Sequence, residues 1–217
     1  MDKRFNLPRL AWFAAIALVS VVFWLSPVLA PLKIFVVFIH ETGHALATLL
    51  TGGSVRAMVV TPWQSGYVQP LGGNALVIAS AGYVGSALFG GLMLSLSGRK
   101  QWTQHIFITL ALVFGVVTFA FVRNLFGWVF GLGGTAVFGF LAYKRLSFSV
   151  YIVDFLAVTS SMYALYDLSD FLWLGARTDA VILSEITGVP AFMWALIWSA
   201  ISLLVVYGAG KRALTRP

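Results

Sequence analysis

Long apolar runs alternate with short polar or glycine- and proline-containing breaks along most of the chain. A run of about 18 residues or more is long enough to cross the hydrocarbon core of a bilayer as a helix. The pattern predicts seven helices, at residues 10–30, 34–51, 74–97, 104–122, 125–143, 148–173 and 190–208. The connections leave no room for a soluble domain of useful size, so we expect a single domain, residues 1–217.

The breaks between the runs contain residues that end helices. Pro27 and Pro31 close the first run, and Thr51-Gly52-Gly53 closes the second. The third run is rich in glycine, alanine and serine, which allow helix backbones to approach closely. We therefore expect the third helix to pack at the centre of a bundle, against the second.

Residues 54–71 follow a different pattern. Val55, Ala57 and Val59 alternate with their neighbours, and residues 62–66 read as a turn before a second short run. This predicts a β-hairpin at one membrane face. A plain interfacial loop anchored by Trp63 and Tyr67 is the alternative.

The composition shows whether the chain belongs in water or in a lipid bilayer. Hydrophobic residues make up 60% of the chain and charged residues 10%, and the mean hydropathy is +0.93. Soluble domains contain about 25% charged residues, so the chain is an integral membrane protein. We expect an all-α polytopic bundle of six to seven transmembrane helices with a short β-hairpin. The net charge of +7 lies at the ends of apolar runs, which argues against nucleic-acid binding and for contact with the lipid bilayer.

The basic residues also predict the orientation. The apolar stretch after Arg9 is too long for a signal peptide, which favours a retained helix. If all later helices cross, the face that should be cytoplasmic contains Lys33, Arg99, Lys100, Lys144, Arg145, Lys211, Arg212 and Arg216, and the other face Arg56, Arg123 and Arg177. The basic residues at positions 3, 4 and 9 conflict with this arrangement, so one of the seven predicted crossings must be wrong.

A metal-binding motif lies within the second apolar run. His40-Glu41-Thr42-Gly43-His44 contains two of the three histidines of the chain. Histidines at positions i and i+4 lie on one helix face, where both can bind one zinc ion, and the glutamate beside them can act as the general base. A structural histidine pair with the glutamate as counter-ion is the alternative, but buried ionisable groups in a membrane segment are costly unless used.

A catalytic zinc ion needs a third protein ligand. The chain has no cysteine, so that ligand must be the third histidine or a carboxylate. His105 lies near a basic pair and reads as an interfacial residue. Asp179 follows Thr178 and begins a short helix towards Glu185, where it could also serve the helix start. Asp167 lies within an apolar helix and is the second candidate ligand, or a partner that orients a histidine.

The chain resembles the site-2 proteases, zinc intramembrane peptidases, in their compact M50B-like branch. The resemblance rests on the motif block at residues 38–46 with Thr51-Gly52-Gly53 after it, on residues 81–87, and on late blocks at 163–170, 178–180 and 185–190. It implies His40 and His44 as ligands, Glu41 as the catalytic residue, and Asp179 in place of the ligand-bearing aspartate. The Leu-Asp-Gly motif of better-studied members is absent, and Thr178-Asp179-Ala180 is only a shortened counterpart.

The resemblance implies a zinc-dependent membrane endopeptidase that cleaves transmembrane protein substrates within or near the bilayer. We expect that membrane to be the bacterial inner membrane. The hairpin could hold such a substrate in an extended form by strand addition. Two alternatives remain at this stage: a non-proteolytic metal-binding pseudoprotease or scaffold, and an ion or small-molecule transporter. The oligomeric state is not determined by the sequence.

Overall fold

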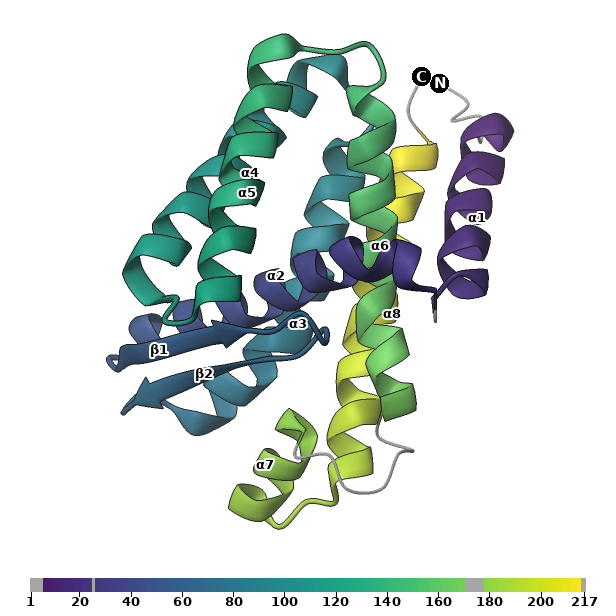
Figure 1. The fold of residues 1–217 in the computed structure, drawn as a ribbon. Coiled ribbons are helices and arrows are strands. Elements are labelled where there is room, and N and C mark those ends of the chain that lie inside the picture. The colour runs from purple at the N-terminus through teal and green to yellow at the C-terminus, as the bar shows by residue number, and fades with distance from the viewer. Residues whose placement is uncertain (1–5, 25, 171–177, 216–217) are drawn as a thin grey trace.

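The computed structural model describes residues 6–24, 26–170 and 178–215, with the backbone alone for residues 100 and 163–170. Helices dominate, and two strands form one hairpin (Figure 1). In chain order the elements are α1 (Leu7–Val22), the 3₁₀-helix η1 (Pro27–Leu29), α2 (Ala30–Leu50), β1 (Ser54–Val60), β2 (Gly66–Leu71), α3 (Ala75–Leu96), α4 (Lys100–Phe121), α5 (Leu125–Lys144), α6 (Ser149–Asp170), α7 (Asp179–Thr187) and α8 (Ala191–Leu214).

Helix α3 lies at the centre of the bundle, as its small residues predicted. It packs against α2, α6 and α8, while α4 and α5 form an antiparallel pair beside them. The approach to α2 is close: a Cβ added to Gly43 would lie 2.5 Å from the carbonyl oxygen of Ala81. Only glycine fits at this crossing, so the two helices meet backbone to backbone.

Helix α2 is the most buried of the candidate spans, and it lies across the direction of α5, α6 and α8 in Figure 1. Its apolar side packs into an aromatic cluster. The Phe38 and Phe114 rings stack with centroids 4.2 Å apart, and the Phe35 and Phe114 rings with centroids 5.7 Å apart. Phe38 and Phe114 are almost completely buried, which fixes α2 against α4.

The predicted hairpin is confirmed. Strands β1 and β2 pair antiparallel, with a bulge between Val55 and Ala57. The outer side of β1 is covered by the α4–α5 connection, where the Arg123 N–H donates to the Met58 carbonyl (3.0 Å) and the Asn124 side chain bonds both backbone groups of Val60. Among the described residues, β2 pairs only with β1.

The first predicted helix, residues 10–30, is wrong at its end. Helix α1 stops at Val22, and η1 and α2 then begin at Pro27 and Ala30. The reason is local: the Ser26 hydroxyl accepts the Val28 N–H (3.2 Å), which starts a new helical turn where the apolar run continues. The last helix extends beyond its predicted end at residue 208, to Leu214.

Five helices among the described residues are long and apolar enough to cross a membrane: Pro27–Leu50, Ala75–Leu96, Gln101–Phe121, Leu125–Lys144 and Ala191–Leu214. Helix α1 and the described apolar part of α6, Ser149–Met162, are shorter. The chain is therefore a mostly helical membrane protein with five candidate spans, where the sequence predicted six to seven.

The conflict among the basic residues has a structural explanation. The Asn6 N–H donates to the Leu214 carbonyl (3.0 Å), and the Arg9 guanidinium bonds Ser97 and Asp154. The start of α1 therefore lies beside the ends of α3 and α8, with the other basic helix ends. Because α2 lies across the bundle, α1 and α2 together lead from this end to the hairpin. Lys33 departs from the predicted grouping, since it is buried near Trp24, beyond the opposite end of α1.

Candidate metal centre

Two histidines of α2 face the central helix α3. His40 and His44 are one turn apart and buried, and their rings meet edge to face with centroids 4.7 Å apart. The space for them comes from Gly82, where an added Cβ would lie 2.6 Å from His44 Nε2 and still closer to His40 Nε2. The two ring nitrogens therefore point at the bare backbone of α3.

Asp179 reaches the histidines from the other end of the sequence. Its Oδ2 atom lies 3.1 Å from His40 Nε2 and 3.1 Å from His44 Nε2. The Thr178 hydroxyl caps the start of α7 by accepting the Val181 N–H (3.4 Å), so Asp179 occupies the first turn of that helix. Burial raises the pKa of the Asp179 carboxyl, but its contacts with the two imidazoles outweigh burial and hold the pKa below its usual value.

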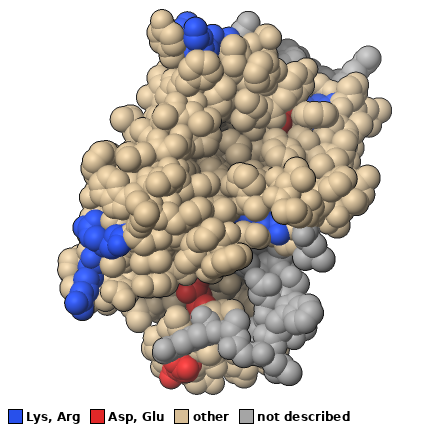
Figure 2. Space-filling view, in the orientation of Figure 1, with Lys and Arg blue, Asp and Glu red and all other residues tan. Residues whose placement is uncertain are grey.

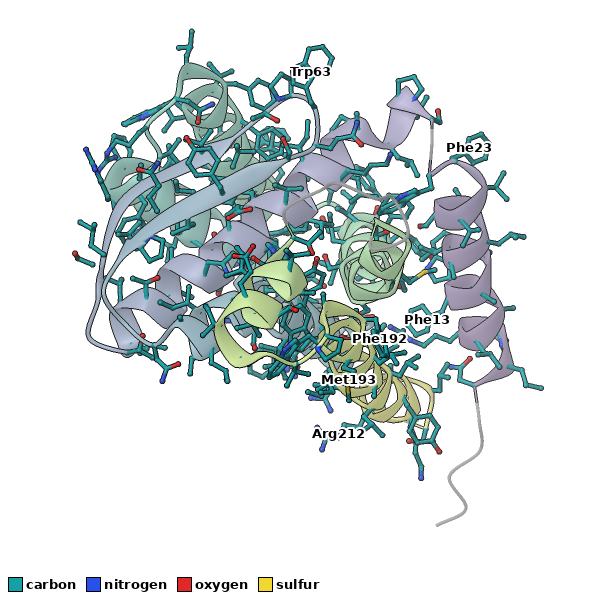
Figure 3. The ribbon with its side chains drawn as sticks, turned by 90° about the horizontal axis from the view of Figure 1, so that it is seen from below. Phe13, Phe23, Trp63, Phe192, Met193 and Arg212 are labelled. Carbon is teal, nitrogen blue, oxygen red and sulfur yellow. The ribbon has the colours of Figure 1, made fainter. Side chains whose placement is uncertain are left out.

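Packing on the opposite side holds α7 in place. Leu183 is completely buried, and with Ala180 it packs against Ala79 of α3 and Trp198 of α8. Seen from below, α7 lies beside the hairpin, and the exposed Phe192 and Met193 mark the start of α8 (Figure 3). The position of Asp179 is thus set by an apolar contact with two helices of the bundle.

The chemistry of the three groups fits a metal ion. His44 Nδ1 lies 2.6 Å from the Ile78 carbonyl oxygen, which can only accept, so this nitrogen carries the proton. In the neutral ring Nε2 then presents a lone pair, and it faces the carboxylate of Asp179. His44 Nε2 and Asp179 Oδ2 lie 3.1 Å apart, and both are then hydrogen-bond acceptors. They require a cation between them or a second proton on His44. A histidine held by a carbonyl at one nitrogen is a usual metal ligand at the other.

The spacing of the three groups also fits zinc. Their candidate ligand atoms all lie within 4.8 Å of one another. Tetrahedral zinc with bonds of about 2.0–2.1 Å separates its ligand atoms by about 3.3 Å. The two distances of 3.1 Å from Asp179 to the histidines are close to this value. Three protein ligands leave the fourth position for water, as in catalytic zinc sites.

Glu41 lies beside this cluster in a cavity of about 480 Å³ that α2, β2, α3 and α7 enclose. It is 5% exposed, and its Oε2 atom has no hydrogen-bond partner among the described residues. Strand β2 passes close by: a Cβ added to Gly66 would lie 2.9 Å from Glu41 Oε1. Figure 2 shows acidic side chains in the lower part of the molecule, where α7 lies. A buried carboxylate with one unbonded oxygen is available to accept a proton.

Sequence reasoning gave no role to the aromatic residues at the site. The Tyr83 ring meets His40 edge to face, with centroids 4.9 Å apart, and stacks on Trp198 at 4.7 Å. Tyr83 lies one residue after Gly82 on α3, within a block that the family resemblance included. Its position next to Gly82 could have indicated that Tyr83 lies at the site. Nothing in the sequence indicated that Trp198 packs against Tyr83.

The two other predicted ligand candidates do not join the described cluster. His105 is exposed on α4, where its Nδ1 atom bonds the Gln101 carbonyl at 2.9 Å. The side chain of Asp167 lies outside the described residues, although the backbone of α6 includes it.

A comparison with protein families decides the relationship. The model of the family described as Peptidase M50B-like matches residues 13–209, which is most of the chain. The chain belongs to the Peptidase M50B-like family. This places it among the site-2 proteases, as the sequence motifs indicated, and supports a membrane metallopeptidase. No curated protein and no solved structure gives a significant match.

Proposed function

We propose that this M50B-like chain is a zinc-dependent intramembrane endopeptidase that cleaves transmembrane protein substrates within or near the bilayer. The observation that carries the proposal is the convergence of His40, His44 and Asp179 on one point beside Glu41. In this proposal the first three residues hold zinc. When bound, the metal supplies an activated water molecule and polarises the peptide carbonyl.

Glu41 has the role of general base. Its Oε2 atom accepts the proton of the attacking water, and the carboxylic acid so formed can later protonate the departing amine. The absence of a competing hydrogen bond at this atom suits that role. The His44 contact with Ile78 holds the imidazole in the tautomer that binds metal.

The hairpin has the role of holding the substrate. A helical substrate buries its carbonyl groups in its own hydrogen bonds and must be unwound before cleavage. The backbone of β2 lines the cavity at Gly66, Tyr67 and Val68, and on its other side it has no strand partner among the described residues. We propose that an extended substrate segment adds along β2, which presents its carbonyl to the metal centre.

The deciding experiment compares Glu41→Gln with the wild type and with Glu185→Gln as control. Glu185 is an acidic residue on α7 that does not line the cavity. Glu41→Gln should retain about one zinc ion per chain but stop turnover, because an amide cannot accept the proton. Glu185→Gln should keep both properties.

The substrate can be found in the same experiment. Membrane proteins that accumulate intact in cells with Glu41→Gln, but not with Glu185→Gln, are candidate substrates, and the purified wild type should cut them. If the membrane proteins of the Glu41→Gln and wild-type cells are identical, and neither purified protein cuts a membrane substrate, the chain is a pseudoprotease and the proposal fails.

A further inference from the structure

A second cavity, of about 440 Å³, lies away from the metal centre, between the start of α4, the end of α5 and the start of α6. Its polar lining includes Gln101, Thr103 and Gln104 of α4, Arg145 after α5, and Ser149 of α6. None of the described residues that line it is acidic, and apolar side chains complete its walls.

Two helices begin at this cavity. Gln101, Thr103 and Gln104 are in the first turns of α4, and Ser149 is the first residue of α6. No side chain caps the start of α4. Backbone N–H groups near both starts already donate to carbonyl groups, those of Trp102 and Thr103 to Arg99 and that of Ser149 to Leu146. The helix dipole still gives each start a partial positive charge, which attracts anions. The opposite end charge of α5 is offset by Lys144 in its last turn.

A buried hydroxyl supplies an independent observation. Ser149 is 3% exposed, and its Oγ atom has no hydrogen-bond partner in the part of the chain that is described. A buried polar group usually has a partner, so this hydroxyl is available to a ligand in the cavity. Arg145 adds a formal positive charge, and no acidic side chain of the described residues pairs with it.

Aromatic residues place the cavity at the level of the lipid headgroups. Three exposed aromatic residues lie within two positions of residues that line the cavity. They are Trp102, Tyr143 and Tyr151, with exposed fractions of 38%, 80% and 57%. Exposed tryptophan and tyrosine at helix ends are typical of the membrane interface. Figure 2 shows lysine and arginine side chains at the top of the molecule, where α5 joins α6 in Figure 1.

We propose that this cavity binds a phosphate group, through Arg145, the Ser149 hydroxyl and the positive ends of the α4 and α6 helix dipoles. The phosphate can belong to the headgroup of an anionic phospholipid or to a soluble phosphate ion. The site is separate from the metal centre and does not depend on the proposed peptidase activity.

The test is native mass spectrometry of the full-length protein in detergent, titrated separately with dihexanoyl phosphatidylglycerol, with inorganic phosphate and with dihexanoylglycerol, which lacks phosphate. Ser149→Ala removes the hydroxyl, and Arg145→Asn removes the charge while asparagine tolerates the positive φ of 49°. Lys144→Asn is the matched control, because it removes an equal charge at the neighbouring position that does not line the cavity.

We expect one phosphate-bearing ligand per chain. Its affinity should fall about tenfold in Ser149→Ala and in Arg145→Asn, as for a lost hydrogen bond to a charged group, and less than threefold in Lys144→Asn. Binding of phosphatidylglycerol alone identifies a lipid site, and equal binding of inorganic phosphate identifies a soluble ligand. Equal binding of dihexanoylglycerol, no binding by any probe, or equal losses in Arg145→Asn and Lys144→Asn with none in Ser149→Ala would overturn the proposal.

Discussion

Replacing Gly82 with alanine should remove zinc from the protein without unfolding it. The added Cβ would lie 2.6 Å from His44 Nε2 and closer still to His40 Nε2. Carbon and nitrogen atoms without a bond stay about 3.5 Å apart, so an imidazole or α3 itself must move by at least about 0.9 Å. A metal site tolerates deviations of about 0.2 Å in its ligand distances. The two histidines therefore could not both keep their positions beside Asp179.

The expected losses differ for binding and for stability. Zinc affinity should fall about 100-fold or more, at the upper end of what residues around metal ligands contribute. Overpacking costs about 1–3 kcal/mol of folding free energy, and the helix preference of alanine over glycine returns about 1 kcal/mol. The net destabilisation should thus be about 0–2 kcal/mol, which a folded protein survives.

Gly85→Ala is the matched control, three residues further along α3. Its Cβ would lie 3.7 Å from the Gly43 Cα atom, which is an ordinary contact. Zinc per chain is measured by mass spectrometry of the metal after dialysis against a competing chelator, and the thermal midpoint is measured in the same detergent. Wild-type zinc affinity in a folded Gly82→Ala protein would refute the argument, because the imidazoles would then not depend on the bare backbone of α3.

Three further predictions follow from the same structure. Asp179→Ala should lower zinc affinity at least as much as His44→Ala, measured by chelator competition; full zinc retention would place the third ligand elsewhere. Leu183→Ala should cost about 2–5 kcal/mol in denaturant unfolding and also weaken zinc binding, because Leu183 anchors the helix that carries Asp179; unchanged zinc affinity would show that this anchor is not needed. Single cysteines at Trp63, which points outward from the hairpin in Figure 3, and at Gln101 should react with an impermeant reagent from outside only at position 63. Labelling at position 101 alone would reverse the orientation.

The sequence predicted the elements whose signals are local. The boundaries of α3 and α5 agree within one residue with the predicted ranges, because an asparagine precedes each apolar run, and Ser97 or the pair Lys144-Arg145 ends it. The hairpin followed from alternation around a turn at Pro62, and the histidine pair followed from one helical turn of spacing. Each of these patterns depends on residues no more than about a dozen positions apart.

The orientation of α2 could not be predicted from its own residues. A helix of 21 residues with this hydropathy reads as an ordinary span, whether it runs along the bundle or across it. The number of residues before His40 therefore did not give its depth. The basic residues at the start of the chain conflicted with the predicted orientation. They showed that one predicted crossing was wrong, but not which one. The contacts of Asn6 and Arg9 at the far ends of α8 and α3 show where α1 starts.

The third group of the site, Asp179, contacts His40, which lies 139 positions earlier in the chain. No local sequence pattern encodes such a contact. Asp179 was a reasonable candidate by resemblance, but its place was equally typical of a residue that begins a helix. In the structure Thr178 provides the cap, and the carboxylate of Asp179 faces the histidines instead. A capping threonine before the aspartate is thus a sequence feature that separates a ligand from a cap at this position.

The His-Glu-x-x-His motif is therefore necessary for this site but not sufficient, because the surrounding elements must approach it without side chains. Gly82 brings α3 to the two imidazoles, and Gly66 brings β2 to the Glu41 carboxylate. A larger residue at position 82 would displace the two imidazoles proposed as ligands, whereas one at position 66 would displace the proposed base, Glu41, or strand β2. If the proposed roles hold, substitutions at the two glycines should separate metal binding from proton transfer, since each glycine limits the space around a different part of the motif.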